Sequence, residues 1–455
     1  MKCSKEFFLW LSVFFVATLL GLICCTSIAL ADAPTGDVLD PVIEQAVAAA
    51  GIRKLEGRHL TLYTDLPADK EVDDLPRVFD LAVPAWCEYF GVQPTEVADW
   101  RMRGHLMGDR AAFRTAGLLS DDLPNFRNGY SRGSQLWWDD QQWSGQQWDS
   151  QPAIYYRRHL MLHEGTHGFM NRTYGGCGPG WYMEGMAEML GTHRLTGDGL
   201  QLGYFPARRQ DVPKLGRIRL VQKRVATSGV RSIAQIFSTN NRSHLKNEAY
   251  AWCWALAKFL DMHPRYQARF RSMPRHVTDP NFTQRFLSEF RDDWPQLCQE
   301  WRLFAGTLVH NHDLVGTAID FQPGQPLETG TARCQIETNR GWQSSRVTLL
   351  AGKTYSLRAS GRYQLAQTPA IWWCEPGGVT IRYHRGSPIG LLQAAIVPEP
   401  TNQTPKPSPL LSPIDVGTAA KISPAVSGTL YLRVNDSPGE LADNRGQVEV
   451  TISAN

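Results

Sequence analysis

Charge of one sign, long apolar runs and cysteine motifs are all scarce in this chain. Its 455 residues carry a formal net charge of +3, and the lysines and arginines are dispersed rather than gathered in runs. Because the sequence has no basic stretch, we expect no nucleic-acid partner. No internal repeat is visible, and the apolar and charged fractions are ordinary for a soluble globular protein. The length allows two or three domains.

The only long apolar run lies at the N-terminus. A basic start precedes the apolar stretch 7–23, and a small-residue A-x-A site at 29–31 follows it. This order is typical of a cleaved secretory signal peptide, here residues 1–31. An uncleaved membrane anchor is the alternative, because the apolar length alone would allow it. We expect an exported protein, periplasmic, cell-surface or secreted, with no membrane span after cleavage.

Cysteine is infrequent, and no C-x-x-C pair occurs. Zinc ligation by cysteine is therefore not expected. Six cysteines follow the signal segment: Cys87, Cys177, Cys253, Cys298, Cys334 and Cys374. An even number in an exported chain permits disulfides. Cys334 could pair with Cys374, and Cys253 with Cys298; the alternative is six unpaired thiols.

The pattern of the chain changes near residue 320. Before it, short strands are expected at 59–63 and 100–107, and helices at 75–90, 155–171, 181–193 and 247–263. After it, Gly- and Pro-punctuated alternation predicts an all-β sandwich or jelly-roll-like domain over 321–455, with a Pro-rich loop at 397–413. Between the first strands and the helix expected at 155–171, residues 134–150 are expected as a loop. Its four tryptophans, Trp137, Trp138, Trp143 and Trp148, either bind substrate or simply pack down.

The strongest chemical signal is His163-Glu164-Gly165-Thr166-His167, an H-E-x-x-H motif in a helical pattern. Two histidines four residues apart lie on one face of a helix, about one turn from each other. Both imidazoles can then bind one Zn²⁺. Glu164 is placed to take a proton from water on the open side of the metal. The alternative is a histidine pair satisfied by hydrogen bonds, with no metal.

A zinc site that works on water needs a third protein ligand. The helix expected at 181–193 supplies Glu184, which follows the motif closely enough in sequence to serve as that ligand. Glu188 lies one helical turn later on the same face. It could accept the free ring N–H of a ligating histidine and so fix its tautomer.

H-E-x-x-H followed by E-G-x-A-E at 184–188 resembles the gluzincin metallopeptidases, in the broad sense that includes peptidase-MA-like proteins. The resemblance implies a zincin-like α+β catalytic domain, here residues 32–320. It also implies His163, His167 and Glu184 as zinc ligands, Glu164 as general base and Glu188 behind the ligands.

The chain also departs from that pattern in two places. It has no G-A-M-E-N motif, so a preference for free amino termini is unsupported, and no H-x-x-G-x-x-H extension, which excludes the metzincin arrangement. Related enzymes stabilise the oxyanion with a Tyr or His from a later element. The candidates for this role are Tyr250, His244 and His263, of which Tyr250 is preferred. The alternative is that Tyr250 is only an aromatic residue packed on its helix.

The C-terminal region carries a second signal at 435–446. Asp436, Asp443 and Asn444 offer oxygen ligands on a loop that a Pro-Gly turn tightens. Hard oxygen ligands at this density suit Ca²⁺. A solvated acidic hairpin loop is the alternative.

The pattern N-D-x-P-G-x-x-x-D-N-x-G resembles the calcium-dependent galactophilic bacterial lectins (LecA-like domains), over roughly residues 335–453. The resemblance implies calcium contacts from Asp436, Asp443 and Asn444, with the Glu440 carbonyl as a further contact. Other sugar contacts of that family do not align with this sequence. A purely structural role of the sandwich is therefore the alternative to glycan binding.

Two functions remain. The first is an exported zinc metallopeptidase acting on protein or peptide substrates, with glycans as further partners of the β domain. The second is a carbohydrate-binding or surface protein with a catalytically silent zincin domain. The complete set of His163, Glu164, His167 and Glu184 favours the enzyme.

Overall fold

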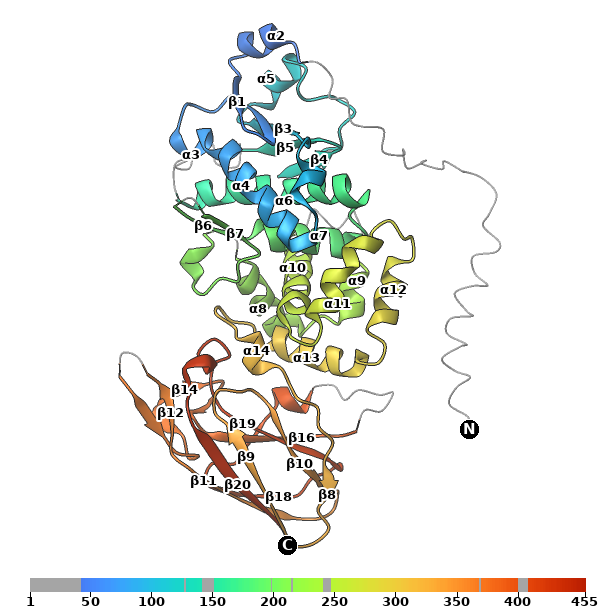
Figure 1. Cartoon of the computed structure of the whole chain (residues 1–455). Coiled ribbons are helices and arrows are strands. Elements are labelled where there is room, and N and C mark those ends of the chain that lie inside the picture. The colour runs from blue at the N-terminus through green and yellow to red at the C-terminus, as the bar shows by residue number, and fades with distance from the viewer. Residues whose placement is uncertain are drawn as a thin grey trace, which may run out of the picture. The chain divides into compact units, whose positions relative to one another are not determined.

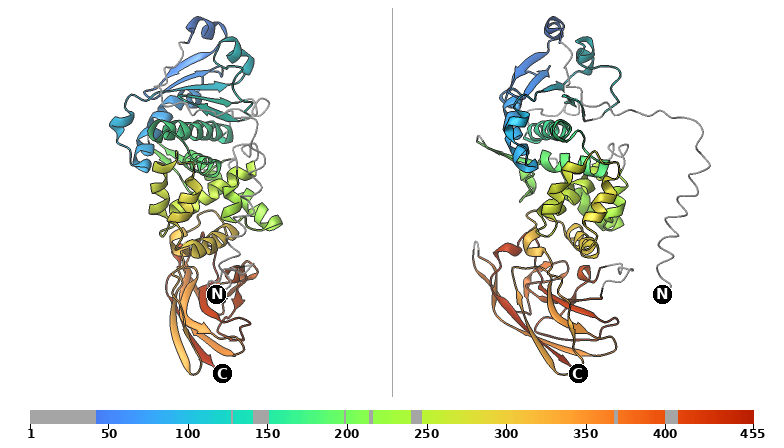
Figure 2. Two further views of the ribbon diagram at one scale, coloured as in Figure 1. Left: turned by 90° about the vertical axis from the view of Figure 1, so that its right-hand side faces the viewer. Right: turned by 45° about the vertical axis from the view of Figure 1, so that its right-hand side comes forward.

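The computed structural model describes residues 42–126, 128–140, 151–197, 199–213, 216–239, 247–367, 370–399 and 408–455. The expected signal segment, residues 1–31, lies outside these ranges. Helices and sheets are mixed up to α14 (Leu314–Thr317), and strands dominate afterwards (Figures 1 and 2), which confirms a mixed α/β region followed by a strand-rich one. None of the described helices has the length and apolar character needed to cross a bilayer.

A five-stranded sheet forms the N-terminal part of the described chain, in the order β1-β2-β3-β5-β4. Its strands are β1 (Arg53–Glu56), β2 (Leu60–Thr64), β3 (Met102–Met107), β4 (Gly129–Arg132) and β5 (Gln135–Asp139). β2, β3 and β5 run parallel, and β1 and β4 pair antiparallel at the two edges. The two strands expected in this region are confirmed as β2 and β3.

Part of the expected tryptophan-rich loop is a strand. Trp137 and Trp138 lie in β5 and are buried, at 3% and 0% exposure. This stretch is a strand with a partner on each side rather than a loop. Trp143 and Trp148 lie outside the described residues.

Two long helices pack beside this sheet (Figure 1). α4 (Leu75–Phe90) continues through Pro84 and ends at Gly91, whose φ of 67° suits a residue without a side chain. α6 (Gln151–Tyr174) carries the H-E-x-x-H motif. The smaller elements nearby are α2 (Glu44–Ala49), α3 (Lys70–Asp73), η1 (Pro94–Val97) and α5 (Arg110–Thr115).

The rest of this region is helical apart from one hairpin, β6 (His193–Thr196) with β7 (Gly199–Leu202). The helix α10 (Asn247–Met262) is buried along most of its length and packs against both α7 (Gly180–Gly191) and α8 (Arg217–Ser228). The remaining helices are η3 (Arg209–Asp211), α9 (Ile233–Phe237), α11 (Gln267–Ser272), η5 (Met273–His276), α12 (Phe282–Glu289) and α13 (Trp294–Gly306).

The C-terminal region contains two sheets that share one hydrophobic core. One has the order β17-β16-β19-β10-β8 and the other β18-β11-β20-β9. Leu432 of the first sheet and Leu357 and Val450 of the second meet in the core, at 0% to 1% exposure. The strands are β8 (Gln325–Pro326), β9 (Thr331–Glu337), β10 (Gln343–Leu349), β11 (Tyr355–Ser360), β16 (Leu392–Val397), β17 (Ile414–Asp415), β18 (Ala419–Ile422), β19 (Gly428–Val434) and β20 (Gln447–Ala454).

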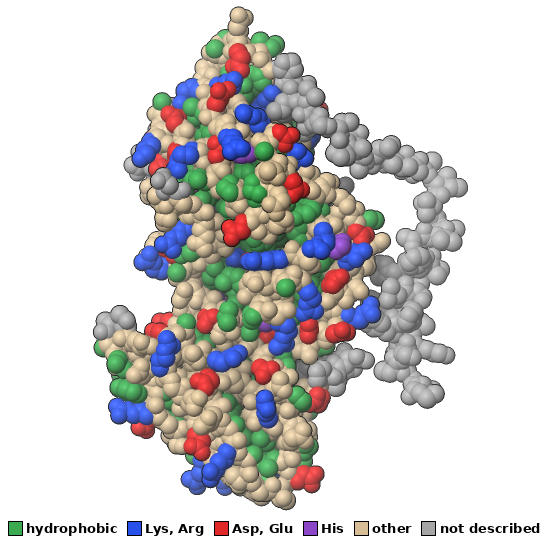
Figure 3. Space-filling view, viewed as in Figure 1, with side chains coloured by type: hydrophobic (Ala, Val, Ile, Leu, Met, Phe, Trp, Pro, Cys, Tyr) green, Lys and Arg blue, Asp and Glu red, His purple; other side chains and the backbone are tan. Residues whose placement is uncertain are grey.

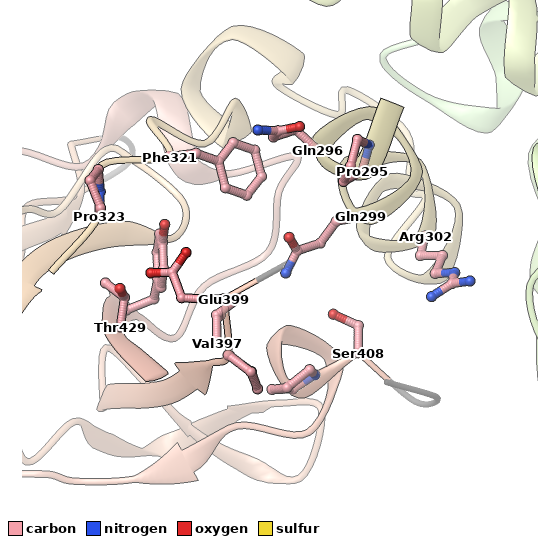
Figure 4. Close-up of a pocket in the computed structure, with 13 residues that line it drawn as sticks. Pro295, Gln296, Gln299, Arg302, Phe321, Pro323, Val397, Glu399, Ser408 and Thr429 are labelled. Carbon is pink, nitrogen blue, oxygen red and sulfur yellow. The ribbon is translucent and has the colours of Figure 1, made fainter. Parts of the chain in front are cut away.

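Two ribbons extend this region: β12 (Tyr363–Ala366) with β13 (Trp372–Cys374), and β14 (Val379–His384) with β15 (Ser387–Ile389). The short helices η6 (Pro409–Leu411) and η7 (Leu441–Asp443) complete it. A pocket of about 240 Å³ lies between α13 and the first sheet, and in Figure 4 Gln299 of α13 reaches toward Glu399 and Phe321.

All six cysteines in the described part of the chain are free thiols. The pairing considered between Cys334 and Cys374, and between Cys253 and Cys298, does not form. Basic and acidic side chains are interspersed over the face shown in Figure 3, in line with the dispersed charges of the sequence.

Candidate metal centre

Helix α6 presents three histidines, His159, His163 and His167, four residues apart. Four residues exceed one helical turn by about 40°, so the three side chains follow one face. All three are buried, at 1%, 5% and 7% exposure. The ring centroids of His163 and His167 are 4.9 Å apart, with the rings nearly perpendicular. The helix therefore delivers adjacent imidazoles, as the spacing predicts.

The small residues between the two histidines let α4 approach α6 from the other side. A β-carbon at Gly165 would lie 2.7 Å from Phe79 and 2.8 Å from Trp86 of α4. Thr166 accepts a hydrogen bond from the Trp86 indole N–H at 3.2 Å. The motif residues thus fix the helix against the core with one face and present histidines on the other.

Helix α7 brings Glu184 to these histidines. Glu184 Oε2 lies 3.3 Å from His163 Nε2 and 3.9 Å from His167 Nε2. Gly185 allows this close approach, because a β-carbon there would lie 3.0 Å from the Cys253 carbonyl of α10. The helix packing that places Glu184 thus depends on a glycine directly after it.

The three residues fit a metal ion. One ligand atom from each of His163, His167 and Glu184 lies within 4.8 Å of the others. Glu184 Oε2 is buried and has no hydrogen-bond partner, which is costly for a carboxylate unless a cation binds it. Two imidazole nitrogens and one carboxylate oxygen are a donor set that suits zinc, and a metal would satisfy the unpaired oxygen.

Glu188 lies behind the ligands, one turn along α7. Its Oε1 is 3.5 Å from His163 Nδ1 and 3.7 Å from His159 Nε2. Arg217 of α8 donates two hydrogen bonds to the same carboxylate, at 2.7 and 2.8 Å. Burial alone would raise the pKa of Glu188, but Arg217, His159 and His163 together outweigh it and hold the pKa well below its usual range.

His159 and Arg217 were not identified from the sequence. His159 lies four residues, about one helical turn, before His163, and this spacing is the sequence signal that could have identified it. His159, His163 and Glu188 form a second group of possible metal ligands, with atoms within 4.8 Å. Arg217 comes from a helix 29 residues beyond Glu188 in sequence, and no motif joins the two.

Glu164 is buried, at 5% exposure, and strand β4 lies against it. Burial raises the pKa of the Glu164 carboxyl to about 7, although the neighbouring His163 opposes the shift. Ser131 of β4 hydrogen-bonds the same carboxyl group. A β-carbon at Gly129 would lie only 2.6 Å from Glu164 Oε1. The carboxylate therefore occupies space that only a glycine in β4 leaves open.

Of the three residues considered for stabilising the oxyanion, Tyr250 is the one that lies beside the histidines of the metal centre. Its ring centroid is 6.1 Å from that of His163, and the Arg217 guanidinium lies 5.7 Å from it. Burial raises the pKa of Tyr250, so its hydroxyl stays protonated. His263 instead faces Glu300, at 3.1 Å, and stacks on Tyr266. His244 lies outside the described residues.

In the C-terminal region, the four residues expected to bind calcium do not all lie together. Asp436 and Asn444 are buried, and Asn444 Nδ2 donates to Asp436 Oδ2 at 2.9 Å. Asp443 is exposed, and its carbonyl accepts from Gln367. The exposed Glu440 pairs through its carboxylate with Arg382. The structure therefore brings together the side chains of Asp436 and Asn444 and leaves that of Asp443 at the surface; the contact expected from Glu440 was its backbone carbonyl.

No family model matches the chain, and no curated protein does. Among solved structures, the N-terminal domain of EclA, a PllA-like lectin, is similar over 27% of this chain and 95% of its own, at 20% identity and a TM-score of 0.21. An aminopeptidase N family protein from Idiomarina loihiensis is similar over 89% of this chain and 68% of its own, at 11% identity and a TM-score of 0.36.

A third similar structure is IMPa from Pseudomonas aeruginosa, a metallopeptidase solved in complex with an O-glycopeptide. It is similar over 55% of this chain and 25% of its own, at 13% identity and a TM-score of 0.17. Because all of these TM-scores and identities are low, the function of this chain is inferred from the site itself.

Proposed function

We propose that the chain is an exported zinc metallopeptidase of the gluzincin type, with a zincin-like catalytic domain over residues 32–320. The observation that carries the proposal is the buried cluster of His163, His167 and Glu184, within 4.8 Å, beside Glu164 on the same helix. Three protein ligands leave room for a water or a substrate oxygen on zinc. The basic, apolar and small-residue order of the first 31 residues supports export.

The side chains divide the chemistry among them. Zinc, when bound, would activate water and polarise a peptide carbonyl. Glu164 accepts the proton of the attacking water and passes it to the leaving amine. The protonated Tyr250 hydroxyl donates a hydrogen bond to the carbonyl oxygen as negative charge develops there. Arg217 fixes Glu188, and Glu188 orients His163 through its Nδ1.

The sheet edge beside Glu164 supports a peptide as substrate. β4 pairs with β5 on one side and, within the described residues, with no strand on the other. An edge strand offers unpaired backbone N–H and C=O groups that an extended peptide can meet. A β-carbon at Gly129 of this strand would lie 2.6 Å from Glu164 Oε1, so a peptide aligned along β4 would pass near the general base.

Metal analysis combined with hydrolysis tests the proposal. Purified protein should hold one zinc per chain and cleave casein or a peptide library, and a chelator should abolish cleavage until zinc is restored. Glu164→Gln should keep the zinc and lose about 10² to 10⁴-fold in rate, because the proton acceptor is gone. Glu289→Gln, an exposed change of the same kind on α12, is the control.

Stoichiometric zinc without turnover, in the wild type and in Glu164→Gln alike, would contradict the peptidase function. The second reading, a carbohydrate-binding or surface protein with a silent zincin domain, would then stand. A wild-type protein without zinc would also contradict the peptidase function.

We further infer that the C-terminal region, residues 321–455, binds Ca²⁺ at Asp436 and Asn444 and thereby glycans, as the lectin resemblance implies. The observation in favour is the buried Asp436 carboxylate, whose pKa burial raises to about 6, with only an amide beside it at Oδ2. Glycan-array binding with and without calcium tests this, and Asp436→Asn should lose binding. Equal glycan retention with chelator present would contradict it.

A further inference from the structure

A basic hollow lies beside the metal centre, and apart from Arg217 its lining residues have no role in the function proposed above. It measures about 730 Å³, and the N-terminus of α8 lies in its wall. Figure 1 shows α8 beside α10, the helix that also packs on α7. None of its described lining residues is acidic, whereas Arg209, Arg217, Arg219 and His310 all line it.

Two of the three guanidinium groups have no acidic partner. Arg217 is held by Glu188. Arg209 and Arg219 are exposed and make no hydrogen bond or ion pair with any described residue. The nearby Asp211 does not line the hollow and is engaged by Tyr204 and by the Arg208 backbone. Among the described residues, Arg209 and Arg219 therefore give the hollow positive charge that no ion pair offsets.

The start of α8 adds backbone donors to these charges. Gly216 precedes the helix and offers no side-chain cap, and the first turn contains no acidic residue. The backbone N–H groups of Arg217, Ile218 and Arg219 have no partner among the described residues. Free N–H groups at a helix N-terminus attract anions, and the helix dipole acts in the same direction.

A residue in the same wall also carries a buried donor without a partner. Trp254 lines the hollow and is 1% exposed, and its indole Nε1–H has no hydrogen-bond partner. The ring itself is well packed, because it stacks on Phe205 with centroids 5.9 Å apart. An indole N–H can only donate, so the group that satisfies it must be an acceptor.

We propose that this hollow is an anion-binding site for a carboxylate or phosphate-type oxyanion. Guanidinium groups bind both through paired N–H donors, and the helix N–H groups and the Trp254 N–H add further donors. Arg217 joins the site to the metal centre, because it also holds Glu188 beside His163. The anion is either a free small ion or an acidic group of the substrate; the second case rests on the proposed peptidase function.

The length of α6 sets the scale for such a substrate group when it lies near Pro152. Pro152, at the start of α6, lines the hollow, and His163 lies roughly 16 Å further along the helix axis. An extended peptide spans about 3.3 Å per residue, so the acidic group would lie about five residues from the scissile bond.

Titration of the zinc-loaded chain with inorganic phosphate at constant ionic strength tests the site without any need for turnover. Arg209→Gln and Arg219→Gln should each weaken phosphate binding about tenfold, through loss of charge-assisted hydrogen bonds. Lys223→Gln, an exposed change on the same helix outside the hollow, is the matched control and should bind as the wild type does. Trp254→Phe keeps the ring and removes the donor, so it should also weaken binding.

The results separate the possibilities. Phosphate held at the metal would be retained equally in Arg209→Gln and Arg219→Gln, and that result, or no binding to the wild type, would overturn the proposal. Peptides with Glu or Gln placed about five residues from the cleaved bond distinguish the sources. A lower KM for the Glu peptide that Arg219→Gln abolishes assigns the anion to the substrate. Equal KM values with intact phosphate binding assign it to a free anion.

Discussion

Gly129→Ala is the sharpest test of how strand β4 shapes the metal centre. The added methyl group would lie 2.6 Å from Glu164 Oε1 and 3.2 Å from its Cδ and Cγ atoms. An ordinary contact needs about 3.5 Å, so the carboxylate would have to move by about 1 Å. Glu164 is 5% exposed and has little free space, so it would move away from the position in which it meets water on the metal.

Displacement of a catalytic group by about 1 Å costs on the order of 10² in rate. We therefore expect kcat to fall about 100-fold in Gly129→Ala. The clash involves only the end of one flexible side chain, and an alanine restricts the unfolded chain, so the free energy of unfolding should change by less than about 1 kcal/mol. Zinc content should be unchanged, because the three atoms nearest the added methyl group all belong to Glu164 and none to a proposed ligand.

Peptide hydrolysis, zinc analysis and thermal unfolding on the same preparations measure all three quantities. Gly176→Ala is the control, because its β-carbon would lie no closer than 3.5 Å to any atom outside its chain neighbours. The double variant Gly129→Ala with Glu164→Gln should be no slower than Glu164→Gln alone, since both act through one carboxylate. Full activity in Gly129→Ala would refute the reasoning.

Three further predictions concern stability. Arg217→Met leaves the buried Glu188 without its cation and should lower the free energy of unfolding by about 3–5 kcal/mol in urea, with partial recovery when Glu188→Gln is added. Gly165→Ala would push a methyl group into Phe79 and should cost about 1–3 kcal/mol by the same assay while zinc binding persists. His105 is neutral in the fold, because burial lowers its pKa to about 3. The contribution of neutral His105 to the free energy of unfolding is fully present above pH 6.5, the ordinary pKa of histidine. It is lost as the pH falls toward 3, by up to about 1.4 kcal/mol per pH unit. His105→Phe should therefore make the free energy of unfolding depend less steeply on pH in this range. An unchanged slope in His105→Phe would contradict that assignment.

The helices of the metal centre could be predicted because each carries its own periodic pattern. The expected helix at 155–171 lies within α6, and the one at 181–193 corresponds to α7. His163, His167 and Glu184 are close together because helical spacing fixes the first two and α7 follows directly. Local regularity was therefore sufficient for the ligand cluster.

The environment of that cluster could not be predicted, because it comes from pairings distant in sequence. Arg217 reaches Glu188 through the packing of α8, and Gly129 reaches Glu164 through the register of an edge strand. The sequence predicts a loop around Trp137 because the tryptophans there are interleaved with polar residues. Only its pairing with β3 and β4 shows it to be a strand.

The free thiols have a consequence for how this protein can be prepared. All six described cysteines are unpaired, and four of them are buried: Cys87, Cys177, Cys253 and Cys374. Folding of the described chain therefore needs no oxidant, and expression in a reducing or an oxidising compartment should give the same fold. Mild reductants should leave the melting temperature unchanged, so any inhibition by a dithiol would report its competition for the metal rather than damage to the fold.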